Sequence, residues 1–171
     1  YFGKKPTVLR NSSLSPANKQ GRIAADHICG RRSAYTGALG TSVLKLFDLT
    51  AASTGLNEKQ ARAAGVAYDK VVTYSTSHAS YYPGARNMTV KTLFDPASGR
   101  ILGAQIVGFD GVDKRMDVLA AAIRAGLTAE QLTELDLAYA PPYGSAKDPV
   151  NMAGYVIENV RAGLVEQHHW D

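Results

Sequence analysis

Residues 88–107 have the sequence MTVKTLFDPASGRILGAQIV, two apolar runs joined by a short segment of turn-forming residues. The runs 88–94 and 101–107 have the length and the content of branched and aromatic side chains that are typical of β-strands. The intervening DPASG contains aspartate, proline, serine and glycine, which favour a tight reversal of the chain. This stretch therefore predicts an antiparallel hairpin.

Upstream of the hairpin, residues 43–49 and 66–76 are expected to form two more strands, because β-forming residues dominate both runs. A short helix is expected between them. Asn57 and Gln60 have the spacing of a capping box at its start, and Gly65 marks its end. The sequence thus predicts a sheet of about four strands.

Downstream of the hairpin, the pattern changes to helical periodicity. Apolar residues recur along 112–126 at the spacing of one helical face. Thr128 with Gln131 fits a second capping box, and Asp148 followed by Pro149 favours the start of a longer helix. Strands followed by helices predict an α+β fold, in which helices cover one face of an antiparallel sheet.

A separate helix is expected before the sheet. Ser15 followed by Pro16 is a favourable helix start, and Gly30 is a plausible stop, so a helix is predicted over 17–29. The glycine-containing segment 33–41 is typical of a linker. The sequence therefore predicts a helical unit, a linker and one main domain.

Composition places the chain among globular proteins, with 45% hydrophobic and 20% charged residues in 171. No run approaches the roughly 18 apolar residues of a membrane helix, and the first residues lack the apolar run of a signal peptide. The net charge is +4, but basic residues are scattered and lack interleaved aromatic residues. We therefore expect a cytoplasmic protein with no membrane and no nucleic-acid partner. The start at Tyr1, without an initiator methionine, indicates that further chain precedes it.

Catalytic machinery is sparse in this sequence. The single cysteine, Cys29, excludes an intramolecular disulfide and a dithiol pair, fits a reducing compartment, and is expected to be a small buried apolar residue of the first helix. The pair His168 and His169 lacks a second pair of ligands, so no metal site is predicted. No activated nucleophile occurs with its base, so the chain alone is not expected to be a complete enzyme.

The segment from Tyr139 to Pro149, YAPPYGSAKDP, is a candidate binding loop. Its two consecutive prolines restrict the backbone and would hold Tyr139, Tyr143 and Lys147 in place before a ligand arrives. A phenol can donate a hydrogen bond or act as an acid, and a lysine can hold a phosphate or carbonyl. The alternative is a rigid connector whose tyrosines only pack, and composition leaves both open.

Residues 78–84, HASYYPG, form a second candidate. Tyr81 and Tyr82 are adjacent at the end of a predicted strand, before a Pro-Gly turn. Neighbouring residues of an extended chain point to opposite sides, so one tyrosine is expected to face a site and the other the core. The sequence does not decide between them. His78 is expected to be structural or solvent-facing.

Several segments resemble one family. Residues 15–26, SPANKQGRIAAD, resemble the helix that ends the FAD domain in coenzyme A disulfide reductases and related NADH oxidases. Other segments resemble the C-terminal dimerisation domain of that family: TSVLKLFD (41–48), TGLNE (54–58), GRILGAQ (99–105) and GVDKRMD (111–117). The two tyrosine segments point to the coenzyme A disulfide reductase branch.

The resemblance implies a division of the chain into three parts. Residues 1–36 would be the tail of the FAD domain, 37–165 the dimerisation domain, and 166–171 a connector to the rhodanese domain that some members have. The redox cysteine, the FAD fingerprint and the NAD(P)H domain of the family would all lie upstream. FAD and NAD(P)H are thus expected in the full-length enzyme, and neither is expected to be held by this fragment alone.

The resemblance also implies a homodimer in which this domain reaches the partner subunit's redox cysteine and its site for coenzyme A or a coenzyme A disulfide. Tyr81 and Tyr139 are the implied catalytic residues, and Lys147, Tyr82 and Tyr143 are implied substrate contacts. The implied flavin contacts are Pro16, Ala17, Asn18 and Gln20. Two alternatives stay open: an NADH oxidase or persulfide reductase of the same family, and a free-standing α+β scaffold or binding protein.

Overall fold

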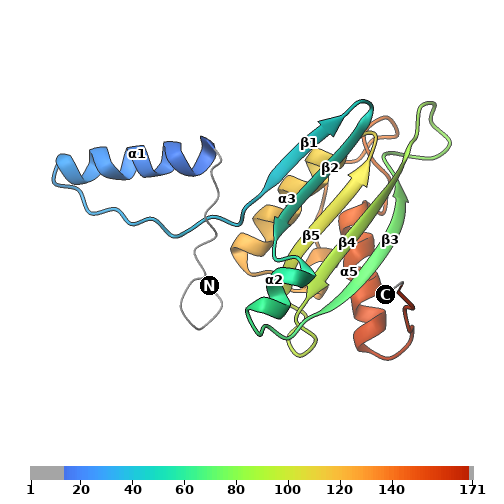
Figure 1. The fold of residues 1–171 in the computed structure, drawn as a ribbon. Helices are drawn as coiled ribbons and strands as arrows, with labels where there is room; N and C mark the ends of the chain where they lie inside the picture. The colour runs from blue at the N-terminus through green and yellow to red at the C-terminus, as the bar shows by residue number, and fades with distance from the viewer. Residues whose placement is uncertain (1–13, 170–171) are drawn as a thin grey trace. The chain divides into compact units, whose positions relative to one another are not determined.

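The hairpin expected at residues 88–107 is present and lies within a five-stranded antiparallel sheet of order β1-β2-β5-β4-β3 (Figure 1). The computed structural model describes residues 14–169, which divide into two units between Gly40 and Thr41. The strands are β1 (Ser42–Leu46), β2 (Leu49–Gly55), β3 (Asp69–Thr76), β4 (Asn87–Phe94) and β5 (Ile101–Gly108). At the hairpin turn, the Asp95 carboxylate accepts from the backbone N–H groups of Ala97 and Ser98. The α+β fold class is confirmed.

The prediction of a single strand over 43–49 was wrong, because the chain reverses inside that segment. Phe47 has a left-handed backbone (φ 53°), and β1 and β2 pair across this turn. The sequence of β2, LTAASTG, is too small and polar to stand out as a strand. Its small side chains suit its place, because β2 is hydrogen-bonded to strands on both sides and packs against a helix.

The helices of this unit are α2 (Glu58–Ala63), α3 (Val112–Ala125), α4 (Ala129–Thr133) and α5 (Pro149–Arg161). Both predicted capping boxes are present, at Asn57 with Gln60 and at Thr128 with Gln131. The predicted cap of α5 is also present, since the Asp148 side chain accepts from the N–H of Val150. Hydrogen bonds between residues close in the sequence thus determine where α2, α4 and α5 begin.

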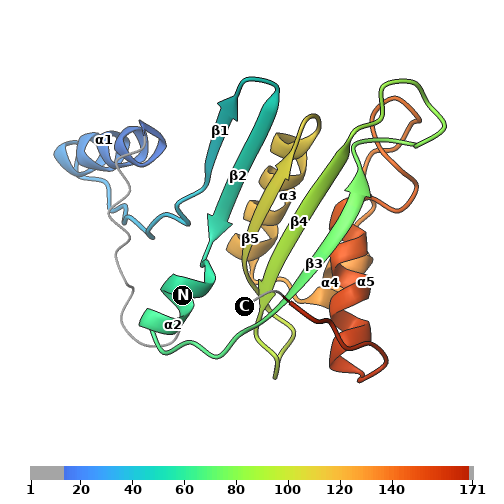
Figure 2. The ribbon, with the colours of Figure 1, turned by 45° about the vertical axis from the view of Figure 1, so that its right-hand side comes forward.

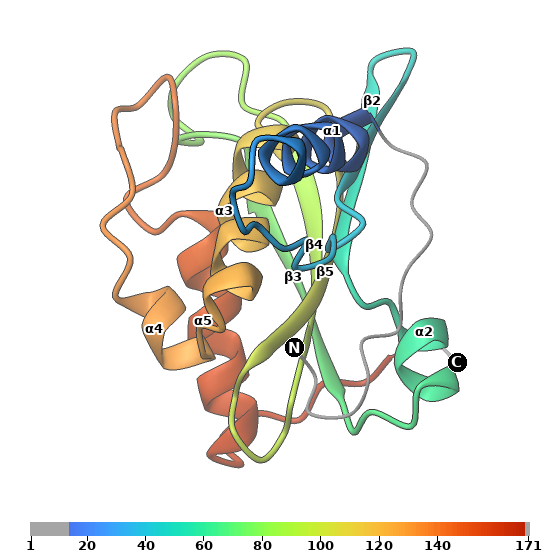
Figure 3. The same ribbon diagram turned by 90° about the vertical axis from the view of Figure 1, so that its left-hand side faces the viewer.

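Helices α3 and α5 cover one face of the sheet, as predicted (Figures 2 and 3). The main core lies between these layers. It includes Val71, Val90 and Ile106 from the strands and Leu119 and Ile157 from the helices, all essentially inaccessible to solvent. Burial of side chains of this size contributes about 1.5–3 kcal/mol each. This packing holds α3 and α5 against the sheet. It therefore also sets the positions at which the connections to these helices begin and end.

The opposite face of the sheet leaves apolar side chains exposed. Leu44, Val107 and Tyr74 lie in one cross-strand row, which Ala51 and Thr89 complete. Leu44, Val107 and Tyr74 are all exposed, Tyr74 at 80%. Contiguous exposed apolar surface is typical of a region that another protein surface covers.

The first unit contains α1 (Leu14–Ile28), followed by Gly30 with a left-handed backbone (φ 76°). The helix was expected over 17–29 with Ser15 as its cap. It begins at Leu14 instead, so Ser15 lies inside the helix. Cys29 is exposed, and the prediction that it is buried was wrong. Among the described residues of this unit, α1 is the only helix and no strand accompanies it, so Cys29 has no core to enter.

The C-terminal segment returns to the sheet instead of fraying after α5. The Gln167 side chain accepts from the N–H of Val72 (3.0 Å) and donates to its carbonyl (3.4 Å). Val72 lies on β3, an edge strand that has no neighbouring strand on its outer side among residues 14–169. The side-chain amide thus occupies part of an edge that would otherwise be free to pair.

Glu58 links α2 to the sheet and makes the unit sensitive to acid. Hydrogen bonds from Lys91 and Lys70 lower the pKa of Glu58 from its ordinary 4.5 to about 2. A carboxyl group whose pKa is lowered on folding stabilises the fold above its unfolded pKa, and this stabilisation is lost as the pH falls through the folded pKa. We expect Glu58→Gln to lower the free energy of unfolding by about 1–2 kcal/mol at neutral pH, with the difference disappearing near pH 2.

Urea denaturation followed by circular dichroism at several pH values measures this effect. Glu134→Gln is the matched control, because Glu134 is exposed and its side chain is in no ion pair among residues 14–169. A difference between Glu58→Gln and the parent chain that stays constant from neutral to acid pH would contradict the assignment.

Candidate functional site

Two exposed tyrosines that are 58 residues apart in the sequence meet at one end of the sheet. The hydroxyl groups of Tyr81 and Tyr139 are 3.2 Å apart, within hydrogen-bonding distance. Tyr81 lies on the connection between β3 and β4, and Tyr139 on the connection between α4 and α5, and the two loops run side by side (Figures 1 and 3). Tyr81 is 74% exposed and Tyr139 49%, so neither phenol is a core residue.

Backbone hydrogen bonds hold the two loops together. The N–H of Ala79 donates to the carbonyl of Gly144 at 2.8 Å, which joins one loop to the other. Ser77 and Arg86 close the first loop at its base, with the N–H of Ser77 donating to the carbonyl of Arg86. In the second loop, the N–H of Tyr143 donates to the carbonyl of Ala140 and forms a tight turn over the two prolines. The tyrosine pair therefore rests on fixed backbone.

The neighbouring residues Tyr81 and Tyr82 have different surroundings. The ring of Tyr82 meets the ring of His78 edge to face, with centroids 5.8 Å apart. His78 is buried and so does not face solvent, whereas Tyr82 is 42% exposed; the expectation that one of the two tyrosines faces the core was therefore wrong. Tyr81 is the member of the pair that reaches the second loop.

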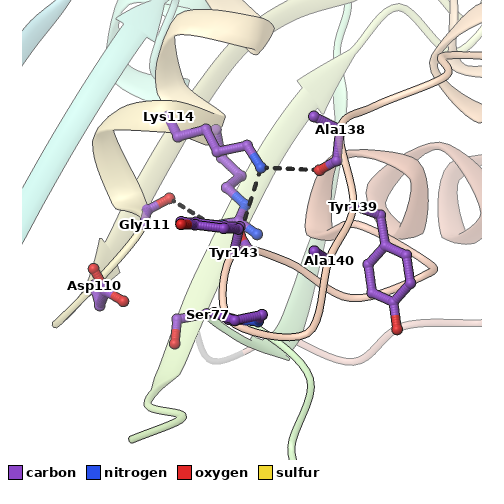
Figure 4. A pocket seen from close by; sticks show the side chains of 10 residues that line it. Ser77, Asp110, Gly111, Lys114, Ala138, Tyr139, Ala140 and Tyr143 are labelled. Carbon is purple, nitrogen blue, oxygen red and sulfur yellow. Dashed lines mark hydrogen bonds between the residues drawn. The ribbon is translucent and has the colours of Figure 1, made fainter. Parts of the chain in front are cut away.

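A pocket of about 450 Å³ lies beside the tyrosine pair (Figure 4). Tyr139 and Tyr143 line it from the second loop, Ser77 from the first, Asp110 from the turn before α3, and Lys114 from the first turn of α3. The pocket thus joins both loops to a helix terminus.

Beneath the pocket, Arg115 and Asp148 form a buried ion pair. Their side chains are 1% and 5% exposed, and a guanidinium nitrogen lies 2.9 Å from a carboxylate oxygen. Arg115 also donates to the carbonyl of Gly111 at 3.2 Å. The pair ties α3 to the first turn of α5, where the second loop ends.

The other predicted site residues are more scattered. Lys147 is exposed and does not line the pocket, although it is only one residue before the α5 cap. The candidate flavin contacts lie on the first turns of α1, in the first unit, where Pro16 is buried and Ala17, Asn18 and Gln20 are exposed. Sequence reasoning missed Lys114 and Arg115, because charged residues on a helix usually face solvent.

The contact between the hydroxyl groups of Tyr81 and Tyr139 also changes the pKa of Tyr139. The hydrogen bond with Tyr81, together with a smaller contribution from desolvation, raises the pKa of Tyr139 above its ordinary 10. Tyr139 therefore remains a protonated phenol, and a potential hydrogen-bond donor, throughout the physiological range.

Removing the Tyr81 hydroxyl is expected to lower the pKa of Tyr139 toward its ordinary value. In Tyr81→Phe the aromatic ring remains but the hydrogen bond is lost, so the phenolate of Tyr139 forms at lower pH. Titration of chain labelled with ¹³C at tyrosine Cζ measures this, with Tyr139→Phe assigning the signal and Tyr155→Phe as the control. An unchanged Tyr139 titration in Tyr81→Phe would show that the two hydroxyls do not interact.

Two other classes of site are absent from the described residues. Within 14–169, no group of three or more His, Cys, Asp or Glu side chains could hold a metal ion. In the same range, no helix combines the length and apolar character needed to cross a membrane.

Comparison with known proteins identifies relatives of the sheet-containing unit. Residues 41–149 match the family described as pyridine nucleotide-disulphide oxidoreductase, dimerisation domain. The coenzyme A disulfide reductase of Staphylococcus haemolyticus is 41% identical over 140 residues, which cover 81% of this chain and 31% of that protein. A Staphylococcus aureus coenzyme A disulfide reductase is 39% identical over the same length and has 32% of its chain covered.

Solved structures of other proteins have the same fold as this chain. Reduced Bacillus anthracis CoADR-RHD is 54% identical with a TM-score of 0.86, covering 90% of this chain and 28% of that one. A NAD-dependent persulfide reductase from A. fulgidus is 48% identical with a TM-score of 0.86, covering 88% and 28%. The water-forming NADH oxidase of Lactobacillus brevis, at 23% identity and a TM-score of 0.82, shares the fold; 88% of this chain and 33% of that one are covered.

The chain spans about a third of the length of the curated relatives it matches. The family match covers β1 to the first residue of α5, and includes both tyrosine loops and all residues that line the pocket. This chain belongs to the pyridine nucleotide-disulphide oxidoreductases, as a member of their dimerisation-domain family.

Proposed function

We propose that this chain is the dimerisation segment of an FAD-dependent, NAD(P)H-using disulfide reductase that acts on coenzyme A disulfide, and that it presents Tyr81 and Tyr139 to the active site of the partner subunit. The observation that supports this most directly is the 3.2 Å contact between two exposed phenols on separate loops. A solvent-exposed hydrogen bond contributes little to stability, so a role outside folding is the better explanation for the pair.

The chemistry of the pair suits a disulfide substrate. When a disulfide is reduced, one sulfur leaves as a thiolate, and a hydrogen bond from a phenol stabilises that negative charge. The raised pKa of Tyr139 keeps its proton in place for this donation. Flavin, when bound by the full-length enzyme, would supply the electrons; the role of Tyr81 and Tyr139 is to orient the substrate and stabilise the leaving sulfur.

The remaining site residues have supporting roles in this proposal. Tyr143, which lines the pocket, and Tyr82 and Lys147, which are exposed nearby in the two loops, contact the substrate. A lysine suits coenzyme A, whose phosphates are negatively charged. Residues Pro16, Ala17, Asn18 and Gln20 approach the flavin, which the chain upstream of this segment holds.

A persulfide reductase of the same family is the second candidate, because one solved relative at 48% identity has that activity in its name. A sulfur leaving group stabilised by a phenol serves either reaction, so the comparison of coenzyme A disulfide with coenzyme A persulfide as substrates decides between them. A free-standing scaffold is the third candidate. A reading frame without a flavin-binding sequence ahead of Tyr1 would favour it over both enzymes.

Sedimentation tests the dimerisation role. We expect the full-length protein to sediment as a dimer, and a truncation that ends at Gly40 to sediment as a monomer that still binds flavin. The exposed row of Leu44, Val107 and Tyr74 supports an assembly, since apolar surface of this kind is normally covered. Retained flavin shows that the truncated protein is folded. A truncated protein that remains dimeric would contradict the proposal.

A further inference from the structure

We propose that Lys114 is a positioning residue for Tyr139, because its ammonium group holds the loop that bears this tyrosine against α3. This inference rests on the proposed function and adds a residue to its site. The contacts of Lys114 are with backbone carbonyls of the loop, so it acts on Tyr139 through the loop backbone.

The contacts of Lys114 flank the tyrosine segment. Its Nζ lies 3.4 Å from the carbonyl oxygen of Ala138 and 3.5 Å from that of Tyr143, as the dashed lines in Figure 4 show. Tyr139 and the two prolines lie between these carbonyls in the sequence. One ammonium group therefore donates to the carbonyls on both sides of this segment and holds the two ends of the segment close together.

The adjacent residues explain why this donor is available. Arg115 is fully engaged with Asp148 and Gly111, so it anchors the far end of the loop. Lys114 is in no ion pair within 4.0 Å in the part of the chain that the structure describes. Its charge is therefore directed to the two carbonyls rather than to a carboxylate.

The loop depends on few attachments. Between α4 and α5 the backbone forms no regular secondary structure, and the two prolines restrict its dihedral angles without tying it to the domain. Besides Lys114, it is held by the Asn151 side chain, which donates to the Leu135 carbonyl near the start of the loop, by the Gly144 carbonyl, which accepts from the N–H of Ala79, and by the Asp148 cap. Gly144 and Asp148 both follow Tyr139. Lys114 is the attachment that reaches Ala138, the residue immediately before Tyr139.

Loss of Lys114 is expected to let Tyr139 move away from Tyr81. A displacement of about 1 Å in a positioned group can reduce a rate by up to about 100-fold. We expect Lys114→Met, which keeps most of the side-chain stem but removes the ammonium group, to lower kcat about tenfold with a smaller effect on KM. Lys114→Arg, which keeps the charge and donors, is expected to restore most of the activity.

A double-mutant cycle on the flavin-loaded, full-length enzyme tests the inference. We expect Lys114→Met to lower kcat about tenfold when Tyr139 is present. In a Tyr139→Phe background we expect less than a twofold effect, because Lys114 acts by positioning the Tyr139 hydroxyl, which is then absent. Lys59→Met is the matched control, since Lys59 is an exposed helical lysine on α2 and is in no ion pair among residues 14–169. Additive losses, or a fully active Lys114→Met, would overturn the positioning role.

A second readout does not depend on activity. Titration of ¹³C-labelled tyrosine in the same full-length enzyme is expected to show the pKa of Tyr139 lowered in Lys114→Met, because the hydrogen bond with Tyr81 is weakened. An unchanged titration would overturn the inference and leave the proposed function intact. Full turnover in Tyr139→Phe would instead overturn the catalytic role of that tyrosine, whatever the titration showed for Lys114.

Discussion

Arg115→Met is expected to lower the free energy of unfolding by about 3–5 kcal/mol, because it leaves the Asp148 carboxylate buried without its partner. The side chains of Arg115 and Asp148 are only 1% and 5% exposed, so water cannot replace the lost guanidinium group without opening the structure. Asp148 also caps α5, and the loss therefore extends to the start of a core helix. Urea denaturation of the chain followed by circular dichroism measures the change.

A matched control and a double variant sharpen this prediction. Arg62→Met, at an exposed position of α2, is expected to change the unfolding free energy by less than about 0.5 kcal/mol. Combining Arg115→Met with Asp148→Asn is expected to recover part of the loss, because no unpaired charge then remains buried. If Arg115→Met were as stable as Arg62→Met, the ion pair would not hold α3 and α5 together.

Tyr139→Phe in the full-length enzyme is expected to lower turnover with a disulfide substrate by about 10- to 100-fold while flavin content stays normal. The substitution keeps the ring and removes only the hydroxyl group, so the fold is preserved and the proton donor is lost. A positioned hydrogen-bond donor to a developing negative charge contributes about 100-fold or more to a rate, and part of that is retained when Tyr81 remains.

Kinetic measurements separate this effect from general damage. Reduction of the flavin by NAD(P)H is expected to be unchanged, because the tyrosine acts on the disulfide and not on the nicotinamide. Tyr155→Phe is the control, since Tyr155 lies on α5, away from the tyrosine pair and the pocket lining. Unchanged disulfide turnover in Tyr139→Phe would remove this tyrosine from the mechanism.

Features set by local chemistry could be predicted from the sequence. The hairpin of β4 and β5 and both capping boxes depend on residues a few positions apart, and all are present. Strand β2 was missed because LTAASTG has small, polar side chains whose strand conformation comes from its neighbours β1 and β5. The turn at Phe47 was missed because a left-handed backbone at a bulky residue has no sequence signal.

The arrangement of the site was harder to predict from the sequence. Each tyrosine loop stood out by its prolines and paired aromatic residues, but the contact between Tyr81 and Tyr139 depends on sheet and helix packing across 58 residues. Burial of Arg115 could not be inferred either, because its charge fits the exposed face of a helix and its partner Asp148 already had a role as a cap. Gln167 shows the same limit, since it acts on an edge strand 95 residues away.

Mixed dimers of the full-length enzyme test most directly whether these tyrosines serve the partner subunit. One subunit has Tyr81→Phe and Tyr139→Phe, and the other has both tyrosines but a serine in place of the redox cysteine expected upstream. Each parent homodimer is expected to be nearly inactive. If the tyrosines act across the two-fold axis, the mixed dimer rebuilds one complete site of two and recovers about half of the wild-type turnover. A mixed dimer no more active than its parents would contradict this.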